Sequence, residues 1–234
     1  MREHVRELLD KLDTQVAELG RAAELVLDAV EAGGIVYAAG AGHSLAMVCE
    51  TFYRAGGLAP VRPLWDAALL PLAGARRSSV AEREPGHGRD LVARANPAPP
   101  DVMVVFSTSG RNPYPVEVAQ EALVRGVPVI AVTSLPASAA ATDRSGTRLA
   151  DHATVVLDTG VPPGDVIHPP QAPRTAAVST ILGAYLWASL LAELDRLATA
   201  RKVTLPFWVS SNVPGGDEHN TALLARYAER IPEL

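Results

Sequence analysis

The stretch VMVVFSTSGRNPY at residues 102–114 decides the fold, because it joins a buried strand directly to a helix. Its first five residues are apolar without alternation, which is typical of a strand covered on both faces of a parallel sheet. Asn112 is a good N-cap and Pro113 suits the first helical position, so a helix begins there. The hydroxyl side chains, the glycine and the free backbone amides between strand and helix predict a site for a phosphate dianion. A purely structural capped turn is the alternative interpretation.

Other short apolar runs repeat this pattern and alternate with helical stretches, at residues 35–39, 61–64, 127–133 and 154–157. Such an alternation predicts an α/β fold, doubly wound, with a parallel sheet between two layers of helices. The chain of 234 residues, 48% hydrophobic and 20% charged, is long enough for one large domain and excludes wholesale disorder. Stretches rich in proline and glycine predict long loops at 70–100 and 159–173, and a further loop at 205–216 before a short helix ending at Tyr227.

Apolar side chains recur at steps of three and four between Val5 and Val30, which predicts one amphipathic helix of the order of 40 Å. A stripe of that length favours a homodimer formed through the helix, and a helix lying along its own domain is the alternative. We therefore divide the chain into an N-terminal helix at 1–33, a central domain at 34–195, and a C-terminal loop and helix at 196–234 that complete the same domain.

Several classes of protein are disfavoured by composition. The net charge is −5 and no basic run occurs, so a nucleic-acid partner is not expected. The single cysteine, Cys49, excludes an internal disulfide and a multi-cysteine metal site, and we expect it in the core. No histidine pair has metal-ligand spacing, so we expect no metal and no cofactor. The apolar run at 176–192 is interrupted and predicts a buried helix rather than a membrane span, and the charged amino terminus favours a cytoplasmic protein.

A second glycine-containing turn, Gly40-Ala41-Gly42-His43-Ser44, follows the first predicted strand and leads into a helix. Glycines at such a turn let backbone amides approach a ligand, and the start of a helix favours negative charge. The dinucleotide-binding fingerprint would require glycine where Leu45 stands, which disfavours a nicotinamide-cofactor motif at this turn. Gly42, His43 and Ser44 are candidate ligand contacts, and an ordinary tight turn is the alternative.

The motifs GAGHS and STSGRNPY, and the spacing between them, resemble the sugar isomerase (SIS) domain family over residues 34–193. The resemblance implies a five-stranded parallel sheet of flavodoxin type and a dimer whose sites lie near the subunit interface. It also implies a sugar phosphate as partner. The matching phosphate-binding positions are Ser107, Ser109 and Asn112, with Ser44 nearby. We add Thr108 and Gly110 to the predicted binding loop.

A finer resemblance links SGRNPY and AGAGHS to the SGRTPY and LGAGTS of the N-acetylmuramic acid 6-phosphate etherases. These enzymes remove a proton from C2 of an amino sugar 6-phosphate and expel the C3 substituent. The resemblance implies a carbon–oxygen lyase that dehydrates a substrate such as N-acetylglucosamine 6-phosphate by 2,3-elimination. The chain departs from the etherases at Arg54, where their catalytic glutamate stands. An aldose–ketose phosphosugar isomerase and a non-catalytic sugar-phosphate sensor are the alternatives.

Proton transfer at C2 requires an acid/base pair, and carboxylates in a partly dry pocket can fill both roles. We predict Glu50 and Glu82 as this pair, with His43 contacting the ligand. A solvent-facing Glu50 paired with Arg54 is the alternative. Glu82 is preferred to Glu84 because a proline follows Glu84 and restricts its backbone. Whether Glu84, His87 or His168 reaches the site is left open.

Overall fold

The apolar runs form a five-stranded parallel sheet in a computed structural model that describes residues 1–234. All five predicted strands are confirmed: β1 (Val36–Gly40), β2 (Val61–Leu64), β3 (Val102–Ser107), β4 (Val129–Thr133) and β5 (Val155–Asp158). Every residue of β1 and β4 is buried, as expected of strands covered on both faces. The strand order is β2-β1-β3-β4-β5, so the chain moves outward from β1 to β2 and then returns to β1's other side.

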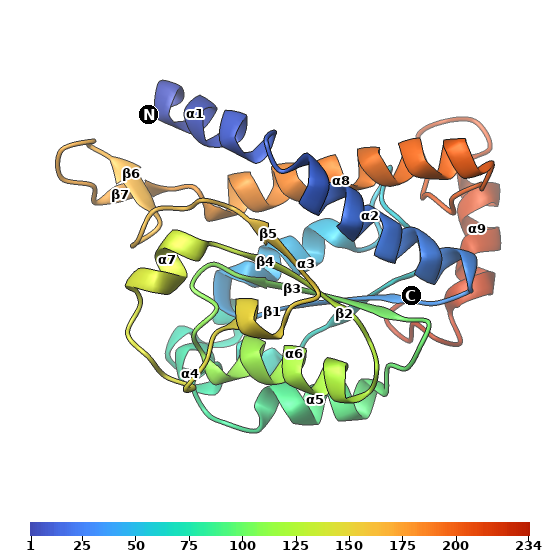
Figure 1. Ribbon diagram of the computed structural model, residues 1–234. Helices are drawn as coiled ribbons and strands as arrows, with labels where there is room; N and C mark the ends of the chain where they lie inside the picture. The colour runs from blue at the N-terminus through green and yellow to red at the C-terminus, as the bar shows by residue number, and fades with distance from the viewer.

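Helices cover both faces of the sheet and confirm the doubly wound α/β prediction (Figure 1). On one face lie α2 (Val16–Glu31), α3 (Leu45–Thr51) and α8 (Ser179–Arg201), and on the other lie α5 (His87–Ala95) and α6 (Pro113–Val124). The remaining helices are α1 (Arg2–Leu12), α4 (Ala75–Ala81), α7 (Leu135–Ala140) and α9 (Gly216–Tyr227). The predicted helix ending at Tyr227 is α9, and the apolar run at 176–192 falls largely within α8, whose inner face is buried.

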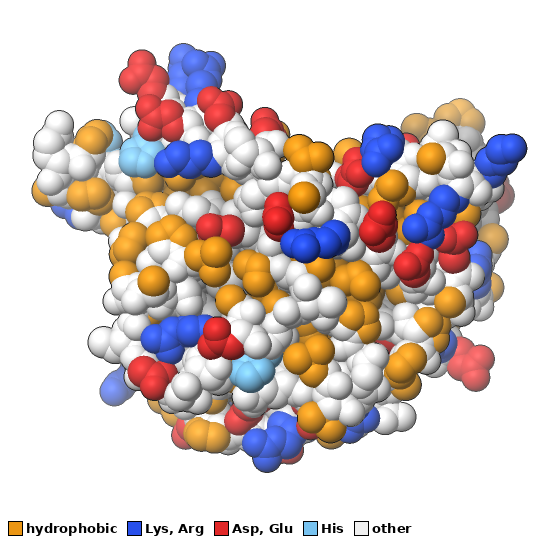
Figure 2. All heavy atoms as spheres, in the orientation of Figure 1, with side chains coloured by type: hydrophobic (Ala, Val, Ile, Leu, Met, Phe, Trp, Pro, Cys, Tyr) orange, Lys and Arg blue, Asp and Glu red, His pale blue; other side chains and the backbone are white.

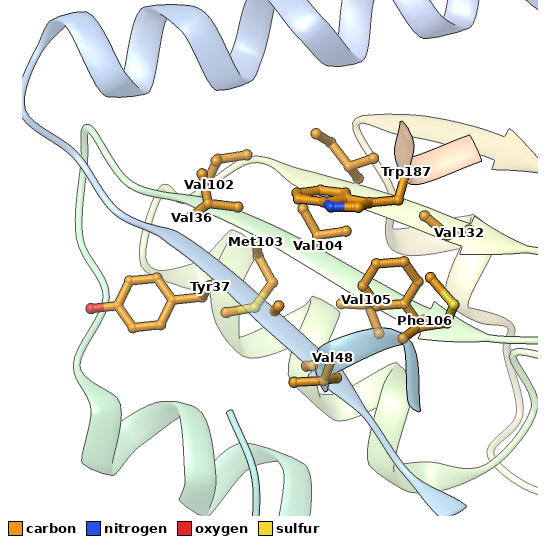
Figure 3. Close-up of a cluster of buried hydrophobic side chains, with 14 of the residues drawn as sticks. Val36, Tyr37, Val48, Val102, Met103, Val104, Val105, Phe106, Val132 and Trp187 are labelled. Atoms are coloured by element: carbon orange, nitrogen blue, oxygen red, sulfur yellow. The ribbon is translucent and has the colours of Figure 1, made fainter. Parts of the chain in front are cut away.

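The core lies between the sheet and its helices, and Figure 3 shows a part of it that includes residues of β1, β3, β4, α3 and α8. Phe106 at the end of β3 packs edge-on against Trp187 of α8, with ring centroids 6.4 Å apart. Val132 of β4 lies beside them. Around the molecule, acidic and basic side chains are interspersed on the face drawn in Figure 2. None of the helices combines the length and apolar character that crossing a bilayer requires.

The prediction of one N-terminal helix was wrong, because the chain breaks between α1 and α2. At the break, the Gln15 side-chain amide donates to the Asp158 carbonyl at 2.7 Å and accepts from the Asp158 N–H at 2.8 Å. Gln15 thus satisfies backbone groups at the end of edge strand β5. Leu8 and Leu12 are buried in the chain's own core, as in the alternative interpretation. The homodimer stays a prediction.

Two predicted loops contain regular structure instead. The stretch 70–100 includes α4 and α5, and the stretch 159–173 runs into an antiparallel hairpin of β6 (Val166–His168) and β7 (Thr175–Ala177). Glycine and proline stand mainly at the boundaries of these elements, such as Gly74 and Gly86 at the N-caps of α4 and α5. Cys49 is exposed rather than in the core, because α3 buries its opposite side through Leu45, Met47, Val48 and Thr51.

Asp101, just before β3, ties the sheet to the C-terminal segment. Its carboxylate is 2% exposed and accepts from the backbone N–H groups of Ile35 at 2.9 Å and Ala98 at 3.1 Å. Arg230 completes the set with a 2.7 Å contact to the same carboxylate. Buried charges are stable only when paired and hydrogen-bonded in this way.

Replacing Asp101 with alanine should therefore lower the free energy of unfolding by about 3 kcal/mol, because the buried Ile35 N–H, the part-buried Ala98 N–H and Arg230 lose their acceptor. Denaturant unfolding followed by circular dichroism measures this change. Arg201→Ala, which removes only surface pairs to Asp28 and Glu31, is the control and should leave the unfolding curve nearly unchanged. A loss below about 1 kcal/mol for Asp101→Ala would contradict the assigned role.

Candidate functional site

The two predicted ligand loops meet at the carboxyl edge of the sheet, where β1 and β3 are neighbours. The register pairs Gly40 with Phe106, so the segments that follow these residues leave the sheet side by side. This is the point where the strand order reverses, and in open α/β sheets ligands bind in the crevice at such a point. The first loop, Gly40–Ser44, leads into α3, and the phosphate loop, Ser107–Asn112, leads into α6.

A cavity of about 270 Å³ lies between the two loops and is lined by most of the predicted site residues. These are Gly42, His43, Ser44, Glu82, Ser107, Thr108, Ser109 and Asn112. Gly110 does not line the cavity but shapes the turn. Its φ is +56°, and a Cβ there would lie 3.0 Å from the Leu149 Cβ, so the turn requires glycine. The Gly110 N–H donates to the Ser107 hydroxyl at 3.2 Å, which closes the turn on itself.

Three arginines that the sequence reasoning missed also line the cavity: Arg83, Arg111 and Arg144. The Arg144 guanidinium donates to the Asn112 side-chain oxygen at 2.8 Å, and Arg111 donates to the Thr142 hydroxyl at 2.5 Å. Three guanidinium groups and the start of α6 make this wall attractive to a dianion. Arg111 stands inside the SGRNPY motif and could have been noticed there. No local sequence pattern marked Arg83 or Arg144 as a site residue.

Glu82 is the one carboxylate among the residues that line the cavity, and it lies at the end of α4. A Cβ on Gly42 would lie 3.7 Å from its Oε2, so the carboxylate faces the first loop. Burial raises the pKa of Glu82 above its ordinary value, and the nearby Arg83, Arg144, His43 and Arg111 oppose that rise. A carboxylate of raised pKa in a cavity is suited to accept a proton.

The segment that carries Glu82 is held against α6 by Glu117. The Glu117 carboxylate accepts from the backbone N–H groups of Gly86 at 2.6 Å and Gly88 at 3.1 Å. The Tyr114 N–H donates to the Glu82 carbonyl at 3.3 Å. A Cβ on Gly88 would lie 2.4 Å from the Tyr114 carbonyl oxygen, so α5 and α6 pack too closely there for any side chain. Helix α6 therefore fixes both the phosphate loop at its start and the position of Glu82.

His43 is exposed on the first loop and reaches across to the start of α8. Its Nε2 lies 3.1 Å from the Ser179 hydroxyl and 3.8 Å from Asp165 Oδ2. The Ser179 hydroxyl donates to Asp165 at 2.6 Å, and Asp165 also accepts from the Ser179 N–H at 2.8 Å. No sequence pattern indicated Asp165 or Ser179, which lie more than 120 residues from His43.

The other candidates lie away from the cavity. Glu50 is on α3, pairs with Arg54 on the next turn, and does not line the cavity, which matches its alternative interpretation. Glu84 and His168 are exposed and are absent from the cavity lining. His87 is half-buried beside Asp66, 3.9 Å from its carboxylate, and packs edge-on against Tyr114.

Comparison with known proteins agrees with this arrangement. Residues 2–134 match the model of the SIS domain. The chain is 38% identical over 234 residues to a UPF0309 protein of Listeria monocytogenes serotype 4b, covering 98% of this chain and 95% of that one. A phosphoheptose isomerase from Francisella tularensis has a similar fold, with a TM-score of 0.57, 19% identity, and coverage of 83% of this chain and 94% of the other.

The Vibrio vulnificus NanR protein, solved as a complex with ManNAc-6P, also has a similar fold. Its TM-score is 0.50 at 14% identity, and the match covers 100% of this chain and 68% of NanR. An α/β sheet with its ligand loops at the strand-order reversal defines a class of small-molecule binding proteins. Within that class, the chain belongs to the SIS domain family, as the resemblance implied.

The role of Glu117 can be tested without a ligand. Glu117→Ala should lower the free energy of unfolding by about 2–3 kcal/mol, because two backbone N–H groups lose a charged acceptor. Amide hydrogen exchange should also speed up at Gly86 and Gly88 more than in the strands. Glu121→Ala removes an i,i+4 pair to Arg125 on the same helix and should cost less than about 1 kcal/mol. Unchanged protection of Gly86 and Gly88 would show that Glu117 does not anchor this segment.

Proposed function

We propose that the cavity binds the phosphate of an open-chain sugar phosphate and that the protein is an aldose–ketose isomerase with Glu82 as its base. One observation carries the proposal: a half-buried carboxylate lies in a cavity that is also lined by serine and threonine hydroxyls and by three arginines close to that carboxylate. The fold shared with a phosphoheptose isomerase and with the sugar-phosphate-bound NanR supports the same class of ligand.

The phosphate end of the ligand is proposed to bind at residues 107–112. Ser107, Thr108 and Ser109 supply hydroxyl donors. The first three residues of α6 add no free amide, because Pro113 and Pro115 lack an N–H and the Tyr114 N–H donates to the Glu82 carbonyl. Arg111 and Arg144 supply charge at the same wall. Binding energy gained at this unreactive end would hold the other end against Glu82, which is how remote contacts accelerate a reaction.

The reacting end requires a base that takes a proton from the carbon beside the carbonyl and returns it to the carbonyl carbon, while the hydroxyl proton on the first of these carbons moves to the carbonyl oxygen. Glu82 can serve for both transfers, because isomerisation returns the proton to the neighbouring carbon. Its raised pKa makes it a stronger base than an exposed glutamate. His43 and Ser44, on the facing loop, are proposed to hydrogen-bond the oxygen on which charge develops.

The 2,3-elimination implied by the etherase resemblance is the second candidate, and the SGRNPY motif favours it. It requires an additional donor that protonates the leaving C3 hydroxyl. Glu50, expected to share the acid/base work, is paired with Arg54 and does not line the cavity, so His43 would have to fill that role. Isomerisation needs one carboxylate only, which is why we propose it first.

Binding of a hexose 6-phosphate should depend on Arg144. We expect Arg144→Ala to weaken the binding of glucose 6-phosphate by roughly tenfold to a hundredfold, measured by isothermal titration calorimetry, because a charged donor to phosphate is lost. Arg196→Ala, which removes an exposed pair to Glu193 on α8, is the matched control and should bind like the wild type. If both variants bind glucose 6-phosphate with equal affinity, the phosphate does not bind at the wall that contains Arg144.

Turnover should depend on Glu82 and on pH in a defined direction. The base must be deprotonated, and burial raises its pKa, so kcat/KM should fall as pH drops through a value above the ordinary glutamate range. Glu82→Gln should abolish turnover while leaving the affinity for glucose 6-phosphate within about threefold, because the phosphate wall is intact.

The reaction can be followed by NMR and mass spectrometry in deuterated water with glucose 6-phosphate and N-acetylglucosamine 6-phosphate. Isomerisation gives a ketose phosphate whose mass equals that of the substrate apart from incorporated deuterium. Elimination gives a product that is lighter by one water. Binding without exchange at C2 would identify a sugar-phosphate sensor and overturn both enzymatic proposals. If Glu82→Gln retains turnover, Glu82 is not the base.

A further inference from the structure

A second, much smaller hollow adjoins the cavity on the side of α8, and we call it the annex. It shares His43, Ser44, Phe106, Ser107 and Thr108 with the cavity and is closed by residues of β4, α3, α8 and the segment after β5. The additional lining residues are Met47, Val132, Thr159, Ser179, Thr180 and Gly183. None of the site residues predicted from the sequence lies on its far wall.

The annex has a volume of about 20 Å³, which is room for one water-sized group. Its floor is apolar and tightly packed. A Cβ on Gly183 would lie 3.2 Å from the Met47 sulfur, and Phe106, which lines the annex, packs edge-on against Trp187 of the core (Figure 3). The annex therefore cannot widen to admit a larger substituent such as an acetamido group without repacking the core.

Thr159 on the far wall has an unsatisfied hydroxyl. The residue is 5% exposed, and its Oγ1 is buried with no hydrogen-bond partner in the protein. Its position is fixed, because its backbone N–H donates to the Thr133 carbonyl at 2.8 Å. The neighbouring Ser179 hydroxyl donates to Asp165 and not to Thr159, and the Ser107 hydroxyl accepts from the Gly110 N–H. Buried polar groups are normally paired, so an unpaired one beside a hollow indicates a missing partner.

We propose that the annex receives a single hydroxyl group of the sugar phosphate held in the cavity, and that Thr159 is a specificity-determining residue that hydrogen-bonds it. The inference rests on the proposed function and narrows its substrate class. The annex selects a sugar phosphate that carries a free hydroxyl at the carbon facing the annex. It rejects a sugar phosphate that carries hydrogen or a bulky substituent at that carbon. Sites that hydrogen-bond a substrate hydroxyl discriminate strongly against its absence, because their own polar groups are left unpaired.

The test uses glucose 6-phosphate, its 2-deoxy, 3-deoxy and 4-deoxy analogues, and inorganic phosphate, titrated calorimetrically into the wild type, Thr159→Val and Thr159→Ser. Valine keeps the shape of the side chain and removes the hydroxyl, and serine restores it. In the wild type, one deoxy analogue should bind roughly tenfold or more weakly than its parent. Thr159→Val should bind that analogue and the parent within about twofold, and Thr159→Ser should recover the discrimination.

Inorganic phosphate probes the phosphate loop alone and should bind all three proteins equally, which confirms that the variants are folded. If the wild type binds glucose 6-phosphate and every deoxy analogue alike, or if Thr159→Val retains the discrimination, the assignment of the annex is overturned and the proposed function stands. If the wild type binds inorganic phosphate but none of the sugar phosphates, the proposed function is wrong. The proposal for the annex is then also wrong, because no sugar hydroxyl is bound there.

Discussion

The parallel pairing of β1 with β3 is the constraint on which the candidate site depends. Because the strands run in the same direction and in register from Val36 opposite Val102 to Gly40 opposite Phe106, both turns that follow them open at one edge. The chain has already moved outward to β2 and returned, so no connecting segment fills the space between these turns. A slip of this register would move the phosphate loop away from the first loop and separate the two walls of the cavity.

Helix α6 adds a second level of organisation to the same edge. Its start carries the phosphate loop, and Glu117, one turn further along, holds the segment that bears Glu82. The loop at 107–112 and the carboxylate of Glu82 are thus fixed to one rigid element. The arginines next to Glu82 oppose the rise in its pKa that burial causes, so a bound dianion that engages those arginines would leave Glu82 a stronger base.

The sequence was most informative where a local pattern carried the physics. Continuous apolar runs predicted five strands, and Asn112-Pro113 predicted the start of α6, because burial on both faces and helix capping depend on neighbouring residues. It was less reliable where a distant contact decided the outcome. The N-terminal helix breaks where Gln15 pairs with Asp158, and α4 and α5 form within a stretch that glycine and proline made look irregular.

By itself, the sequence determined the α/β architecture and the positions of the two turns that follow β1 and β3, since each depends on residues that are adjacent in the chain. It also singled out Glu82. Only the tertiary structure decided which charges meet at the cavity: it brought in Arg83 and Arg144, joined His43 to Asp165 and Ser179, and left Glu50 outside with Arg54. The reason is that electrostatic and hydrogen-bonding partners act over a few ångströms in space, whatever their separation along the chain.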